Sequence, residues 1–156
     1  MGTITPLTIV GELVAGESKQ ARKQLESLIR NLNKNTFDVG RLLHTIKANG
    51  YYEGYTTFQD YVKTLDIKPR KAQYLRRIAE VMEYLKIQPE VYEPVGIAKL
   101  REICSLDYMG EWTDTEGTTH LLAAFIFDMI NKGQEMTLED IKSHVRVLKG
   151  ITSDRR

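Results

Sequence analysis

The sequence predicts an all-α protein: a multi-helix domain with a central helix-turn-helix, followed by a second, smaller helical lobe. Two observations predict this fold class. Apolar residues recur at three- and four-residue steps over most of the 156-residue chain, as on one face of a helix. Glycine, proline and capping threonine fall at the ends of these periodic segments, where helices stop and start. With 42% apolar and 28% charged residues, the composition is that of a soluble globular protein.

A helical hairpin is expected early in the chain. Residues 1–17 contain glycines, a proline and β-branched residues, and are interpreted as a flexible arm. A helix then begins at Ser18, with the apolar face Ala21, Leu25, Leu28, Ile29 and Leu32. A second helix ends at Gly50 and carries Phe37, Val39, Leu42, Leu43 and Ile46. The predicted domains are 18–86 (hairpin plus helix-turn-helix) and 87–150 (helical lobe), with a tail over 151–156.

The helix-turn-helix is predicted over residues 58–84. Thr57 or Thr56 is the expected cap of a short helix from Phe58 to Leu65. Residues 66–68 form the turn, and Pro69 stands in the first turn of the next helix, where proline is best tolerated. Both helices and the turn send apolar residues into one small core: Tyr61, Val62, Leu65, Ile67, Ala72, Leu75, Ile78, Ala79 and Met82.

The outer face of the second helix is basic. Between residues 68 and 86 there are six Lys/Arg and two Glu. One face of the helix presents Arg70, Gln73, Tyr74 and Arg77, with Lys68 and Lys71 beside it. Arginine can pair with a guanine edge and glutamine with an adenine edge, while lysine contacts phosphates without reading sequence. The alternative is a plain solvated surface.

The segment Phe37 to Val81 resembles a helix-turn-helix module of phage and mobile-element proteins. The resemblance rests on an entry helix, a glycine–aromatic link, an F-x-x-Y-V motif and a second helix rich in Ala, Tyr and Arg. The matching residues are Gly54, Tyr55, Phe58, Tyr61, Val62, Ala72, Tyr74 and Arg77. The resemblance covers less than a third of the chain, and Asp66 stands where such modules often have a glycine. It implies binding to double-stranded DNA.

The second half predicts a smaller helical lobe. A short helix is expected around Ile97–Ile103, then an exposed acidic loop over residues 107–120 that contains Trp112. The run LLAAFIFDMI is apolar nearly all round and predicts a central buried helix. A last helix is capped by Thr137 and followed by Gly150. Trp112 has two interpretations, a clamp over the core or, with Glu111 and Asp114, an anchor for a protein partner.

Other functional classes find little support in the sequence. No phosphate loop, dinucleotide fingerprint, metal-binding pair or nucleophile elbow is present, so neither catalysis nor a cofactor or metal is expected. Cys104 is the single cysteine and is expected to be buried. The longest apolar stretch has seven residues, far below the ~20 needed to span a bilayer. No signal peptide opens the chain, and a cytoplasmic protein is expected.

Two hypotheses of different classes follow. The first is a sequence-specific DNA-binding regulator of phage or mobile-element type, a homodimer that places the basic helix in the major groove of a palindromic site. The second is a phage-type interaction protein that binds and inhibits a host protein, such as a polymerase or a defence system, through the acidic loop and Trp112.

Overall fold

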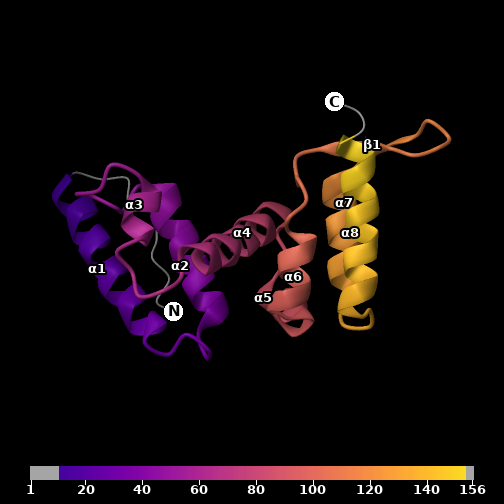
Figure 1. Ribbon diagram of the computed structural model, residues 1–156. Coiled ribbons are helices and arrows are strands. Elements are labelled where there is room, and N and C mark those ends of the chain that lie inside the picture. Colours follow the sequence, from indigo (N-terminus) through magenta and orange to yellow (C-terminus); the bar gives the residue numbers. More distant parts are fainter. Residues whose placement is uncertain (1–10, 154–156) are drawn as a thin grey trace. The chain divides into compact units, whose positions relative to one another are not determined.

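The computed structural model describes residues 11–153, with side chains described for 17–151 (Figure 1). The described chain is mostly helical and has one two-stranded sheet, which confirms the all-α fold class. The chain divides into two compact units between Glu80 and Val81, within α4. The elements are α1 (Gly11–Ile29), α2 (Thr36–Asn49), α3 (Phe58–Val62), α4 (Pro69–Leu85), α5 (Pro89–Tyr92), η1 (Glu93–Val95), α6 (Ile97–Ile103), β1 (Glu111–Thr113), β2 (Thr119–Leu121), α7 (Leu122–Lys132) and α8 (Leu138–Ser153).

In the first unit, α1 and α2 pack against each other as the predicted hairpin (Figure 1). Gly50 ends α2 in the left-handed conformation, with φ of 69°, which glycine adopts without the steric cost that a Cβ would bring. The apolar stripes meet in a core that buries Ala21, Leu25, Ile29, Val39, Leu42, Leu43 and Ile46.

α1 begins earlier than its sequence pattern indicates. It starts at Gly11, seven residues before Ser18, within the segment interpreted as an arm; residues 1–10 of that segment lie outside the described residues. Extending a helix adds one hydrogen bond per residue and needs no new nucleus. A well-formed helix can therefore continue through glycines that give no helical signal on their own.

A glycine sets how closely α2 approaches α4. A Cβ at Gly40 would overlap the backbone carbonyl of Leu75 in α4. The two helices therefore meet backbone to backbone at this point, which a larger residue would prevent. This contact brings α2 directly against α4, the helix that carries the predicted basic face.

The segment over residues 57–85 has the predicted order of short helix, connection and long helix. Thr57 caps α3, where its hydroxyl accepts a hydrogen bond of 3.0 Å from the Asp60 amide. All nine apolar residues expected in the core of this segment are buried, from Tyr61 to Met82. Asp66 is not in a left-handed conformation, since Lys86 is the only non-glycine residue with positive φ in the described chain. An aspartate is therefore compatible with this turn.

The second unit is built from α6, α7 and α8, which pack together with β1 across one end (Figure 1). Cys104 is buried as expected, along with Leu100, Ile103, Ile126, Ile130, Ile141 and Val145. The Thr137 hydroxyl accepts a hydrogen bond of 3.1 Å from the Asp140 amide, which is the predicted cap of α8. α8 runs to Ser153 and so extends past Gly150 into the predicted tail.

The expectation that α7 is buried all round is wrong. Leu122, Ile126, Met129 and Ile130 are buried, but Phe127 is 47% exposed and the preceding Leu121 is 60% exposed. Neighbouring elements cover only one face of α7, and apolar composition alone does not indicate which face lacks a neighbour.

The expected acidic loop contains a β-hairpin instead. β1 and β2 pair antiparallel, with Trp112 opposite His120 and Thr113 opposite Thr119. In the turn, the Asp114 carboxylate accepts backbone hydrogen bonds from Glu116 (2.9 Å) and Thr118 (3.0 Å). Such local bonds from aspartate to the backbone favour tight turns.

Candidate nucleic-acid interface

The two units carry opposite charge. Residues 1–80 contain thirteen Lys/Arg and eight Asp/Glu, a net charge of +5. Residues 81–156 contain nine Lys/Arg and thirteen Asp/Glu, a net charge of −4. The overall charge of +1 therefore conceals a separation along the chain, and a polyanion would be attracted to the first unit.

The residues predicted to contact DNA lie on the outer side of α4 or just before it. Lys68, Arg70 and Gln73 are exposed, while Lys71, Tyr74 and Arg77 are half-buried. The opposite side of the helix buries Ala72, Leu75 and Ile78. The first turn of α4 has no acidic residue. The positive end of the helix dipole thus adds to the side-chain charges instead of being neutralised by a carboxylate.

The cations on this face differ in how firmly they are held. Within the described chain, the side chains of Lys68, Arg70 and Lys71 make no hydrogen bond or ion pair. Arg77 instead lies 3.3 Å from one carboxylate oxygen of Glu80, whose other oxygen lies 2.6 Å from Arg76. Arg76 is the more buried of the two arginines, with 15% of its side chain exposed against 32% for Arg77.

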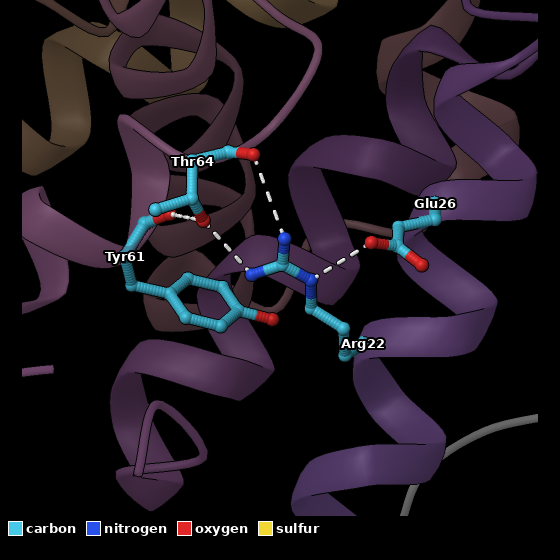
Figure 2. A network of polar contacts seen from close by, with 4 residues as sticks. All are labelled: Arg22, Glu26, Tyr61 and Thr64. Carbon is cyan, nitrogen blue, oxygen red and sulfur yellow. Dashed lines mark hydrogen bonds and ion pairs between the residues drawn. The ribbon is translucent and has the colours of Figure 1, made fainter. Parts of the chain in front are cut away.

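A polar network joins α1 to the end of α3 (Figure 2). Arg22 of α1 donates to Glu26 at 2.9 Å and to the Thr64 hydroxyl at 2.9 Å, and its guanidinium lies 5.1 Å from the centre of the Tyr61 ring. Burial alone would lower the pKa of Arg22, but the hydrogen bond to Glu26 and nearby negative charge raise it above its ordinary value. Burial raises the pKa of the Tyr61 hydroxyl, and Arg22 opposes that change.

Sequence reasoning placed Arg22 off the apolar face of its helix and missed this role. The four-residue spacing of Arg22 and Glu26 was a signal for an ion pair on one helix. Nothing in the sequence connects Arg22 with Thr64, 42 residues away. The network ties the end of α3 to α1, in the segment that leads into α4.

The second unit carries a different candidate surface. Trp112 and Asp114 are half-buried and Glu111 is exposed. The Trp112 ring stacks on His120 with the ring centres 4.6 Å apart. Its buried Nε1 has no hydrogen-bond partner among the described residues. Trp112 is part of the wall of an apolar groove of about 330 Å³, lined also by Phe125, Ser143, His144, Val147, Leu148 and Ile151.

The hairpin beside this groove is held by Asp114. Its carboxylate forms a hydrogen bond of 2.8 Å with the Nε2 of His120, in addition to the two backbone bonds in the turn. The bond with His120 and the backbone bond from Thr118 lower the pKa of Asp114 below its ordinary value. The three predicted partner-binding residues therefore lie on one hairpin, next to the apolar groove.

No His, Cys, Asp and Glu side chains of the described chain gather in a group that could hold a metal ion. None of its helices combines the length and the apolar character needed to cross a membrane. A comparison of the chain with protein-family models, with curated proteins and with solved structures gave no match.

Proposed function

We propose that this protein binds double-stranded DNA through α4 and acts as a regulator, with the outer face of that helix in the major groove. Arg70 and Gln73 stand at the exposed start of the helix, where side chains of a recognition helix contact base edges. Lys68 and Lys71 add phosphate contacts. A single module of this size buries little surface, so a homodimer on a palindromic site would supply the remaining affinity.

One observation carries this proposal. The most basic segment of the chain lies on the solvent side of a helix whose other side is anchored in the core of the positive unit. A helix face that is only exposed to solvent does not need an excess of positive charge. Here the first turn of α4 has cations and no acidic residue, an arrangement that is unfavourable unless an anion compensates it.

The test is binding to random-sequence duplex DNA, measured by fluorescence anisotropy over a salt titration. Binding should weaken steeply with salt, because each phosphate contact releases condensed counterions. Arg70→Ala combined with Arg77→Ala should lower affinity by at least ~30-fold and make the salt slope shallower by about two. The matched control is Lys19→Ala with Lys34→Ala, which removes the same charge from exposed positions of the same unit outside α4.

The control separates a specific face from general charge. If both double variants lose the same affinity, the net charge of the unit matters and α4 is not the interface. If the wild-type protein does not bind DNA even at low salt, the proposal is rejected. Where binding is found, selection from a random library should recover a palindromic site.

The groove beside Trp112 favours a second candidate function, binding of a host protein. Val147 in its wall is 61% exposed, and the Trp112 side chain lines the same groove. Apolar grooves with an aromatic at the wall are typical of protein-binding sites. This candidate would be supported if the wild-type protein captured a host protein and the Arg70→Ala/Arg77→Ala variant still did so. The variants Val147→Asp and Trp112→Ala should lose the capture.

A further inference from the structure

We propose that Arg76, which does not lie on the DNA-facing side of α4, controls how readily Arg77 engages the nucleic acid, because the two arginines share the carboxylate of Glu80. This inference rests on the proposed DNA-binding function. It assigns to Arg76 the role of a positioning residue that acts through its neighbours.

The geometry of the three side chains is unequal. Glu80 Oε1 is 2.6 Å from Arg76 Nη1, and Glu80 Oε2 is 3.3 Å from Arg77 Nη1. The shorter contact belongs to the more buried arginine. Since partly buried pairs are screened less by solvent than exposed ones, the Arg76–Glu80 pair is the stronger of the two.

This inequality determines what happens when Arg77 leaves Glu80 for a phosphate. A carboxylate with one cation partner would be left unneutralised, which costs free energy and opposes the exchange. Because Arg76 stays on Glu80, the carboxylate keeps a partner after Arg77 leaves. Breaking the contact between Arg77 and Glu80 therefore costs less than it would if Arg76 were absent.

The same arrangement limits non-specific binding. Glu80 lies one turn beyond the predicted contact residues and repels phosphates. While Glu80 holds it, Arg77 is a weaker attractant for any polyanion that does not fit the helix. Removing the carboxylate should therefore raise affinity for random DNA.

A double-mutant cycle on the full chain tests this inference, with random-sequence duplex as the probe. With Glu80 present, Arg76→Gln should weaken binding by about two- to fivefold, because Glu80 loses the closer of the two arginines and so opposes the release of Arg77 more strongly. Glu80→Gln alone should strengthen binding by a similar factor. In the Glu80→Gln background, Arg76→Gln should have almost no effect on affinity. In the protein that retains Glu80, Arg76→Lys should bind DNA with near wild-type affinity, because lysine keeps the positive charge.

Three results would overturn this inference alone, and a fourth would overturn the DNA-binding proposal with it. Equal losses from Arg76→Gln in both backgrounds would mean that Arg76 contacts DNA directly. Weaker binding by Glu80→Gln would mean that the carboxylate presents Arg77 to the DNA instead of withholding it. If the wild-type protein binds DNA but Arg76→Gln has no effect in either background, Arg76 has no role and the DNA-binding proposal still stands. If the wild-type protein does not bind DNA, both proposals are rejected. Circular dichroism melts of each variant confirm that the fold is retained.

Discussion

The two units bury apolar cores of the same kind but present different surfaces to solvent. In the described chain, the first unit has one large apolar side chain that is well exposed, Tyr55 at 36%. The second has six: Tyr84, Val91, Met109, Leu121, Phe127 and Val147. The first unit carries +5 and the second −4. A positively charged surface with little exposed apolar area favours nucleic acid, whereas exposed apolar surface favours a protein partner. The DNA-binding hypothesis therefore concerns the first unit, and the protein-binding hypothesis concerns the second.

Each unit also has a glycine at a point of close packing, but the neighbours of the two glycines differ. In the first unit, a Cβ at Gly40 would overlap a backbone carbonyl, that of Leu75. In the second, a Cβ at Gly133 would lie 2.7 Å from a methyl carbon of Val95. A side chain can rotate away from an added methyl group, and a helix backbone cannot do so without moving the helix.

The largest expected effect follows from this difference. Gly40→Ala should lower the free energy of unfolding by about 3 kcal/mol, because α2 and α4 must separate. Gly133→Ala should cost less, about 1–2 kcal/mol, because the shortest approach is to a methyl group of Val95, whose side chain can shift, and the nearest backbone atom, the Met129 oxygen, lies 3.1 Å away. The control is Gly150→Ala in α8, where nothing lies within 4 Å of the added Cβ, and where alanine should stabilise by up to ~1 kcal/mol.

Urea unfolding followed by circular dichroism measures all three variants. The comparison fails if Gly40→Ala costs no more than Gly133→Ala, since the approach of α2 to α4 would then be adjustable. A folded Gly40→Ala protein should also bind DNA more weakly than wild type, because α4 would be displaced from its support.

The Arg22 network gives the next largest effect. Arg22→Met keeps most of the apolar stem but removes the bonds to Glu26 and Thr64, and should cost about 1–2 kcal/mol in urea unfolding. Arg22→Lys should recover only part of this, because one ammonium cannot reproduce the fork of the guanidinium. The control is Lys23→Met at the exposed position next to Arg22, which should change the free energy of unfolding by no more than about 0.5 kcal/mol. Equal stability of the two methionine variants would show that the network does not hold the segment after α3 against α1.

The contrast between the units also explains which features could be predicted from the sequence. The sequence predicts helices α2, α4 and α8 and the core from Tyr61 to Met82, because their apolar residues recur with a 3.6-residue period. Residues such as Thr57 and Gly50 mark where the helices begin and end. The hairpin could not be predicted in this way, because strands of three residues are too short to show an alternating period. The groove depends on side chains from β1, α7 and α8, and no local pattern brings Trp112 next to Val147.

The smallest expected effect concerns the pH dependence of the hairpin. The pKa of Asp114 is lowered below its ordinary value of 3.8 by the hydrogen bond with His120 and by backbone bonds in the turn. A carboxyl whose pKa is lowered on folding stabilises the fold above its unfolded pKa, and this contribution is lost as the pH falls through the folded pKa. Trp112, the only tryptophan, lies on the same hairpin, and its fluorescence should therefore change with a midpoint below pH 3.8.

Asp114→Asn separates this local event from general acid unfolding. The amide keeps the size of the side chain but does not titrate, so the fluorescence change below pH 3.8 should disappear while the helical circular dichroism stays as in wild type. Glu116→Gln, an exposed acid in the same turn, should leave the change intact. If Asp114→Asn retains the wild-type acid transition, the hairpin is held by the stacking of Trp112 on His120 and by its packing on α7 and α8, not by the carboxylate. The protein-binding candidate would then depend on the apolar groove alone, and Asp114 would have no part in it.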